Sequence, residues 1–403
     1  MELEPGYKQT EAGVIPEDWD VDEIIRCADY VDYRGKTPTK ASSGILLLTA
    51  RNIRAGFIDY EVSREYILSS EYESAMQRGR PRVGDVVITT EAPLGMVASL
   101  DRDDVALAQR VIKYRGKSGR LRSAFLKFYF LSPRFQSLLN ENSSGSTAKG
   151  IKGSVLHRLP VILPPLSEQD SIAGALNDAD ALVNSLEQLI AKKRDLRQGA
   201  IQELFRPNTA WVEESLGHVA EIRDGTHQTP KYVEDGVPFF SVENVTSGDF
   251  TNTKFISEAE HNLLTRSFKI EKGDILMTRI GSIGDCKLID WNVDASFYVS
   301  LALLKIRKGY SAAFICYYSE TALFKKEVEL NSLQSAIPKK INLGQISNVR
   351  MKLPASLDEQ SSIASVLSDV DAEIAALETK LAKARQLKQG MMQELLTGRT
   401  RLI

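Results

Sequence analysis

Two long stretches of the chain carry the spacing of apolar residues that is typical of a coiled coil. In each stretch the apolar positions follow one another in steps of three or four residues. They are Ile172, Leu176, Ala179, Val183, Leu186 and Ile190 in the first stretch, and Ile363, Leu367, Val370, Ile374, Leu377, Leu381 and Ala384 in the second. The pattern predicts two helices of about 40 residues, each roughly 60 Å long. A helix of that length needs a partner along its side, and we expect each to be the partner of the other.

The two stretches are also copies of one another. The first opens on Leu163-Pro164-Pro165-Leu166-Ser167-Glu168-Gln169 and ends on Gln198-Gly199-Ala200-Ile201-Gln202-Glu203-Leu204-Phe205. The second opens on Leu353-Pro354-Ala355-Ser356-Leu357-Asp358-Glu359-Gln360 and ends on Gln389-Gly390-Met391-Met392-Gln393-Glu394-Leu395-Leu396. The second opening lacks the double proline and carries one extra residue. A repeat of this length predicts that the chain consists of two similar halves.

The segment that precedes each long stretch reads as short strands and turns. In the first half, Ile45–Thr49 and Asp85–Thr90 have strand composition, each is entered from a glycine, and Arg122–Leu139 reads as a helix interrupted at Pro133. The second half repeats this outline. Trp211 occupies the position equivalent to Trp19, and Gly273-Asp274 occupies the position equivalent to Gly84-Asp85. We also expect Val237–Val245 to be the equivalent of the strand that runs into Arg51-Asn52-Ile53. The framework positions match while the residues around them differ, which suits two related but distinct ligands.

Composition limits the class of protein. The 403 residues are 43% hydrophobic, which is enough for several cores. The net charge is −2, so the chain as a whole is not a polycation. Any binding of nucleic acid must therefore rest on local basic patches or on partners. Neither a disulfide framework nor a thiolate metal cluster is expected, because the three cysteines are widely spaced; they are Cys27, Cys286 and Cys316.

The sequence gives little sign of catalysis. It contains no Asn/Asp-Pro-Pro-Tyr/Phe run for methylation of a base amino group, no glycine-rich adenosylmethionine loop after a strand and no Walker motif. Gly281–Asp285 lacks the lysine of a phosphate loop and reads as a turn. Metal-ligand spacing is absent from the four histidines, which are His157, His218, His227 and His261. We therefore expect no enzyme activity, no metal and no cofactor in this chain.

The chain carries no signal-peptide pattern and no apolar run long enough for a membrane span. We expect a cytoplasmic protein without membrane contact.

Taken together, these features resemble the specificity subunit of type I restriction-modification systems. The resemblance covers nearly the whole chain and depends on four motifs. These are the repeated Leu-Pro-Pro-Leu-Ser-Glu-Gln junction, the Gln-Glu-Leu-Leu/Phe helix end, the opening Gly13-Val14-Ile15-Pro16-Glu17-Asp18-Trp19, and the strand-initiating Gly-Asp. Each motif is weak alone, and the duplicated order makes the set specific.

The resemblance implies an α+β fold with a pseudo-twofold internal repeat. Two similar mixed α/β target recognition domains would be joined by two long helices that form an antiparallel coiled coil. The expected parts are recognition domain 1 at 1–163, spacer helix 1 at 164–206, recognition domain 2 at 207–353 and spacer helix 2 at 354–403. An antiparallel pair also follows from the chain order, because helix 1 leaves domain 1 and enters domain 2, whereas helix 2 leaves domain 2.

The resemblance further implies function and partners. Each recognition domain would read one half of a split double-stranded DNA target. The subunit itself would be non-catalytic and would direct DNA methyltransferase subunits and restriction/translocase subunits to that target. Two alternatives remain open: a specificity subunit for a partner that fuses methyltransferase and nuclease, and a coiled-coil scaffold whose domains bind proteins.

Candidate DNA contacts are basic and amide side chains of the two domains. Phosphates attract lysine and arginine, and base edges pair with arginine, lysine, asparagine and glutamine. In domain 1 the candidates are Arg34, Lys36, Lys40, Arg51, Asn52, Gln109, Arg110, Lys149 and Lys152. In domain 2 they are His227, Gln228, Lys231, Asn244, Arg279, Ser282, Gln334, Lys339 and Lys340. For each of them, a solvated surface role is the simpler alternative.

Overall fold

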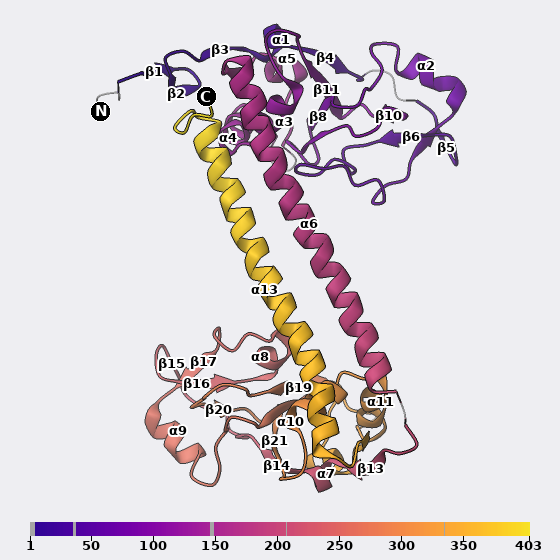
Figure 1. The fold of residues 1–403 in the computed structure, drawn as a ribbon, viewed down its shortest axis with the longest axis vertical. Helices are drawn as coiled ribbons and strands as arrows, with labels where there is room; N and C mark the ends of the chain where they lie inside the picture. The colour runs from indigo at the N-terminus through magenta and orange to yellow at the C-terminus, as the bar shows by residue number, and fades with distance from the viewer. Residues whose placement is uncertain (1–4, 35–37, 146–148, 207, 334) are drawn as a thin grey trace. The chain divides into compact units, whose positions relative to one another are not determined.

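The computed structural model describes residues 5–34, 38–145, 149–206, 208–333 and 335–403. The chain divides into two compact units (Figure 1), residues 1–187 with 380–403 and residues 188–379. Each unit therefore contains one globular part and a section of both long helices, α6 (Leu166–Leu204) and α13 (Leu357–Leu395). None of the described helices is apolar over a length that would cross a membrane.

The first unit builds two four-stranded sheets. One sheet has the order β4-β11-β8-β9 and is antiparallel; because its strands are longer, we call it the longer sheet. The second sheet has the order β10-β6-β7-β5, in which β10 runs parallel to β6. The strands are β1 (Tyr7–Thr10), β2 (Gly13–Pro16), β3 (Asp20–Glu23), β4 (Ala28–Asp32), β5 (Lys40–Ala41), β6 (Ile45–Leu48), β7 (Tyr66–Ile67), β8 (Val86–Thr89), β9 (Val97–Ser99), β10 (Val105–Leu107), β11 (Val111–Gly116) and β12 (Pro160–Leu163). The helices are α1 (Ile24–Cys27), the 3₁₀ turn η1 (Ser69–Glu71), α2 (Tyr72–Ala75), α3 (Ser123–Leu131), α4 (Pro133–Glu141) and α5 (Gly153–Leu156).

From β3 onward, the second unit repeats the order of strands of the first. Its longer sheet is β14-β21-β18-β19, its second sheet is β15-β17-β16-β20, and β20 runs parallel to β16 as β10 does to β6. The strands are β13 (Val212–Ser215), β14 (Ala220–Asp224), β15 (Tyr232–Val233), β16 (Val237–Phe240), β17 (Lys254–Ile256), β18 (Ile275–Ile280), β19 (Ser282–Leu288), β20 (Ser296–Phe297), β21 (Leu301–Ile306) and β22 (Arg350–Leu353). The helices are α7 (Leu216–Val219), α8 (Val242–Ser247), α9 (Glu258–Leu264), α10 (Ala312–Tyr318), α11 (Ala322–Leu330) and α12 (Leu343–Asn348). The internal repeat predicted from the sequence is a repeat of fold.

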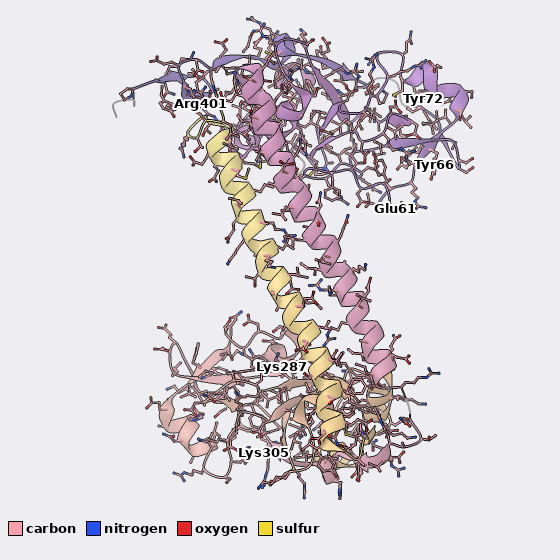
Figure 2. All side chains as sticks on the ribbon, viewed as in Figure 1. Glu61, Tyr66, Tyr72, Lys287, Lys305 and Arg401 are labelled. Atoms are coloured by element: carbon pink, nitrogen blue, oxygen red, sulfur yellow. The ribbon has the colours of Figure 1, made fainter. Side chains whose placement is uncertain are left out.

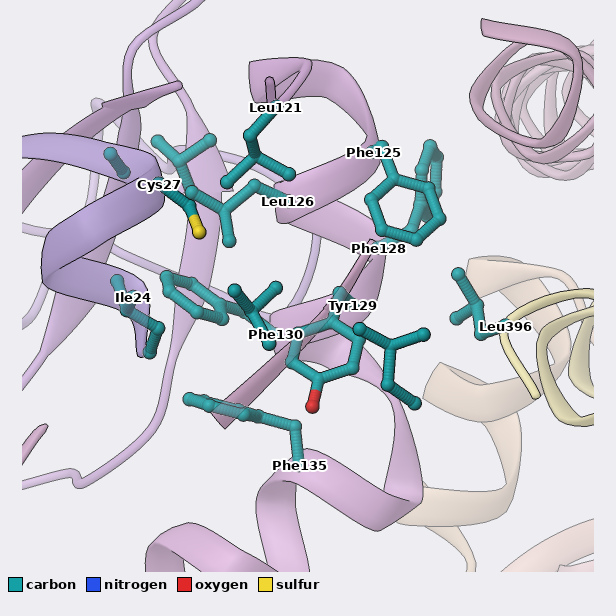
Figure 3. Packing of buried hydrophobic residues seen from close by; sticks show 14 of the residues in the cluster. Ile24, Cys27, Leu121, Phe125, Leu126, Phe128, Tyr129, Phe130, Phe135 and Leu396 are labelled. Atoms are coloured by element: carbon teal, nitrogen blue, oxygen red, sulfur yellow. The ribbon is translucent and has the colours of Figure 1, made fainter. Parts of the chain in front are cut away.

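Aromatic side chains fill the core between the longer sheet and the helices in unit 1. Phe125, Phe130 and Phe135 are fully buried, and the rings of Phe130 and Phe135 stack with centroids 4.5 Å apart (Figure 3). The predicted interruption at Pro133 is confirmed. Helix α3 ends at Leu131, and Ser132 then caps α4 by accepting a hydrogen bond from the Phe135 amide.

The aspartate of the Gly-Asp that precedes a strand in both units stabilises the turn into that strand. Asp85 is buried, accepts the Arg82 amide and binds the Arg115 guanidinium at 2.6 Å. Asp274 does the same in unit 2, where it accepts the Glu271 amide, and Lys305 (labelled in Figure 2) replaces the arginine at 2.8 Å. A buried carboxylate needs such partners, because an unpaired buried ion costs about 3–5 kcal/mol.

The long helices pair in antiparallel fashion within each unit. In unit 2, Arg197 contacts Asp371 while Arg194 contacts Glu378. In unit 1, Glu187 contacts Arg385 while Asp180 contacts Lys388. Residue numbers rise along one helix as they fall along the other, as the sequence predicted.

A glutamine fixes the start of each long helix. Gln169 is fully buried; it accepts the Arg122 amide and donates to the Pro164 carbonyl. Gln360 is buried in the same way, accepting the Ser311 amide and donating to the Pro354 carbonyl. The glutamine of the repeated Glu-Gln thus holds each helix to its globular part.

Candidate nucleic-acid interface

In unit 1, three loops meet at one edge of the longer sheet. Strands β4 and β8 both run antiparallel to β11, so their ends lie beside its start. The Thr90 amide donates to the Arg110 carbonyl at 3.0 Å, and the Ile151 amide donates to the Thr90 carbonyl at 3.0 Å. These bonds hold together the loop after β8, the loop before β11 and the segment before α5.

Most of the candidates from the first half lie exposed on or near this edge. Arg34 pairs with Asp32, Lys40 with Glu65 at 2.8 Å, and Arg110 with Glu91 at 3.1 Å. The exposed candidates are Arg34, Lys40, Arg51, Gln109, Arg110, Lys149 and Lys152. Lys36 lies outside the described residues.

Four of these side chains line one cavity of about 290 Å³. They are Lys40, Arg51, Gln109 and Arg110. The rest of the wall is mainly apolar or small, with Glu65 as its carboxylate. A concave surface that gathers cationic and amide groups from strand β5 and two separate loops can hold a group rich in hydrogen-bond acceptors.

The same edge of unit 2 has the same backbone framework. The Arg279 amide donates to the Ser300 carbonyl at 2.9 Å, and the Ile341 amide donates to the Arg279 carbonyl at 3.0 Å. His227, Gln228, Lys231, Ser282 and Lys339 are exposed there, and Lys340 is half-buried. Gln334 lies outside the described residues.

Carboxylates hold several of the polar groups of unit 2. The His227 ring contacts Asp224 at 2.7 Å, Lys339 pairs with Glu329, and the Ser282 hydroxyl donates to Asp285.

Arg279 differs from the other candidates because its side chain is inside the protein. Only 5% of that side chain is exposed, and its guanidinium lies 3.2 Å from the Asp224 carboxylate. A buried arginine that holds the half-buried Asp224 carboxylate supports the end of β14 and cannot reach a phosphate in this conformation. We therefore leave Arg279 out of the proposed contacts.

Asn52 and Asn244 also serve the fold. Asn52 is fully buried; its oxygen accepts from the Thr49 amide and hydroxyl, and its nitrogen donates to the Asp59 and Ser63 carbonyls. Asn244 does the equivalent in unit 2 with the Ser241 amide and two later carbonyls. A side-chain amide whose groups are all bonded has none left for a base edge. Strand β16 ends at Phe240, so Asn244 lies in a short helix and not in the extended strand that the sequence suggested.

Asn52→Ala is therefore expected to lower stability and leave base preference unchanged. The substitution removes four hydrogen bonds and strands buried backbone groups, so the free energy of unfolding should fall by about 2–4 kcal/mol. Urea unfolding of the purified variant measures the loss. An altered recognition sequence at unaltered stability would show that Asn52 contacts DNA.

The edge of unit 1 is supported from within by a buried histidine. His157 stacks on Tyr30 with ring centroids 3.6 Å apart, and its Nδ1 lies 2.7 Å from the Tyr114 hydroxyl. Burial lowers the pKa of His157 to about 4, so the ring is neutral near pH 7. Burial also acts to raise the pKa of the nearby Asp32, but hydrogen bonds from Arg34 bring that pKa below its ordinary value.

Glu91 and Asp224 are polar residues of this edge that the sequence analysis did not name. Cations and amides are the side chains expected to attract phosphates and base edges, whereas a carboxylate repels phosphates. The position of Glu91 beside Arg110 depends on the meeting of β8 and β11, and these residues are distant in sequence. Both residues lie at strand ends, since Asp224 is the last residue of β14 and Glu91 comes two residues after the end of β8.

The model of one protein family matches both halves of the chain. Its description is "Type I restriction modification DNA specificity domain", and it matches residues 54–193 and 208–386. The chain belongs to this family. As a type I specificity subunit, it has a duplicated fold and two equivalent sheet edges that correspond to the repeated family domain.

Individual relatives agree with this assignment. The type I restriction enzyme MjaVIII specificity subunit of Methanocaldococcus jannaschii is 23% identical over 99% of this chain and 97% of its own length. The EcoBI specificity subunit of Escherichia coli is 24% identical over 72% of this chain and 69% of its own length. The crystal structure of a type I S subunit from M. genitalium shares the fold with a TM-score of 0.63 and 14% identity over 98% of both chains.

Proposed function

We propose that this specificity subunit binds double-stranded DNA at a split target and reads one half with each unit. Residues 1–163 and 207–353 are the recognition domains, and 164–206 and 354–403 form the spacer. The observation that carries this proposal is the pair of equivalent sheet edges that present different side chains. Arg110 and Glu91 in unit 1 stand where Ser300 and Ile280 stand in unit 2. One fold with two different surfaces suits two different half-sites.

The contacts follow from exposure. Lysine and arginine side chains at the two edges face phosphates, and the exposed amides and arginines face base edges. The exposed candidates are Arg34, Lys40, Arg51, Gln109, Arg110, Lys149 and Lys152 in unit 1, and His227, Gln228, Lys231, Ser282 and Lys339 in unit 2. The half-buried Lys340 is included as a phosphate contact. Lys36 and Gln334, which lie outside the described residues, are proposed from the sequence alone. Several of the cations are held by carboxylates, and a phosphate can replace such a partner because it offers the same oxygen acceptors.

The chain itself supplies recognition and no chemistry. DNA methyltransferase subunits bring the adenosylmethionine site, and restriction/translocase subunits bring cleavage. The specificity subunit places these partners on the target.

The test is reconstitution with purified components. The chain alone should transfer no methyl group from adenosylmethionine to DNA, and its affinity for duplex DNA should fall steeply with salt, because phosphate contacts release counterions. With the methyltransferase partner, methylation should appear at a split site that the partner alone does not modify. Methyl transfer by the isolated chain would contradict the proposal. So would a salt-independent complex with other proteins in the absence of any DNA binding.

A further inference from the structure

An exposed arginine–glutamate pair lies on the edge of unit 1. The Arg110 Nε lies 3.1 Å from the Glu91 Oε1, and about half of each side chain is exposed, 52% for Arg110 and 49% for Glu91. Most exposed pairs of this kind contribute little to stability. In this pair, Arg110 lines the cavity described above, on the surface proposed to meet DNA.

The backbone places the two side chains with precision. Arg110 precedes β11 and Glu91 follows β8, and these strands are paired. The Thr90 amide is bonded to the Arg110 carbonyl, and Glu91 forms a backbone bridge with Gly150. Thr90 is buried, so the two Cα atoms are held by the core and not by a loose loop.

A carboxylate on this surface is informative because it repels phosphates. It is favourable against DNA only where a base offers a donor. In the major groove the cytosine N4 amino group is such a donor, and guanine O6 and N7 are adjacent acceptors that match the arginine fork. A guanidinium held through Nε still has two Nη groups for guanine, and a carboxylate held through one oxygen still has the other for cytosine.

We propose that Arg110 and Glu91 together read one G·C base pair in the half-site of unit 1. Arg110 donates to guanine O6 and N7, and Glu91 accepts from cytosine N4. An A·T pair fits less well, because adenine presents the N6 donor where guanine presents the O6 acceptor, and thymine presents the O4 acceptor where cytosine presents the N4 donor. This inference depends on the proposed DNA-recognition function and names the base pair that one part of that surface selects.

Unit 2 supplies an internal comparison. The equivalent bonds, from the Arg279 amide to the Ser300 carbonyl and from Ile280 to Lys340, place Ile280 and Ser300 at the positions of Glu91 and Arg110. Neither residue can act as the donor fork and acceptor described above. The half-site of unit 2 therefore lacks this contact, and the same framework is compatible with isoleucine and serine at these positions.

The experiment maps methylated sites by sequencing after methylation with the partner methyltransferase. The variants are Glu91→Gln, Arg110→Gln and the double change Glu91→Ile with Arg110→Ser, which copies unit 2. We expect one G·C position in one half-site to lose discrimination by about tenfold or more, with the other half-site and the gap unchanged. The matched control is Arg122→Gln with Asp170→Asn, an exposed pair at 2.9 Å beyond the opposite end of β11, which should leave the motif intact.

Each other outcome overturns the inference. If the motif of the double variant keeps its full discrimination at every position, the pair reads no base. If both half-sites change, or the control changes the motif equally, the effect belongs to the fold. If the unmodified chain and its partner produce no split motif, the proposed function fails as well, which the unmodified protein shows before any variant is compared.

Discussion

Glu168→Ala should lower the free energy of unfolding of unit 1 by about 3–5 kcal/mol. Glu168 is 3% exposed; it accepts the indole N–H of Trp19 at 2.9 Å and binds the Arg401 guanidinium at 2.7 Å. Trp19 is fully buried, and Arg401 (labelled in Figure 2) lies over its ring. Removing the carboxylate leaves the buried indole without an acceptor and leaves the Arg401 guanidinium with Asp18 as its remaining partner. This cost exceeds the value of an exposed pair.

The repeat offers a matched control for this prediction. Glu359 is the equivalent residue of unit 2, but it is exposed and makes one longer contact, 3.3 Å, with the Trp211 indole. Glu359→Ala should therefore cost less than about 1 kcal/mol. Urea unfolding of the two variants, followed by tryptophan fluorescence, measures both effects. Equal losses would mean that the Glu168 network does not stabilise unit 1 beyond what its exposed counterpart provides.

Exchange of residues 21–162 for the corresponding segment of another family member should replace one half of the recognition sequence completely. The segment begins and ends on paired strands, since Val21 of β3 lies opposite Ile162 of β12. Its two ends are therefore side by side, and the segment can be exchanged without breaking a sheet between them. The surfaces of unit 2 are untouched, so its half-site should persist.

The control for this exchange is the same operation on the second half. Replacing residues between β13 and β22, whose strands pair in the same way, should alter the other half-site alone. Sequencing of methylated DNA after reaction with the partner methyltransferase measures both outcomes. A hybrid that changes both halves, or neither, would contradict separate recognition by the two units.

Much of this fold could be predicted from local sequence. The long helices follow from apolar residues at coiled-coil spacing, and their antiparallel pairing follows from a repeat in which each helix leaves a different half. A proline inside a helix removes a backbone hydrogen bond and breaks the helix, so Pro133 marked the α3–α4 boundary in the sequence. Gln169 and Gln360 were recognisable as a repeated motif, although their hydrogen bonds to distant backbone amides were not.

The candidate site was harder to predict, because the same residue type serves both structure and binding. Asn52 lies next to the exposed Arg51, yet its side chain points inward to bond the Asp59 and Ser63 carbonyls. Arg279 carries a charge, but its place in a central strand buries it beside Asp224. The direction of a polar side chain depends on where loops distant in sequence come together, and one sequence does not reveal this.

The most direct test of the account is the pattern of methylation that this specificity subunit imposes on its partner. The unmodified chain and a methyltransferase subunit are incubated with adenosylmethionine and genomic DNA, and every methylated base is mapped by sequencing. We predict one motif of two specific half-sites separated by a fixed number of unspecified base pairs. A continuous motif, or a pattern identical to that of the methyltransferase alone, would contradict the claim that two units of one fold each read half of a split DNA target.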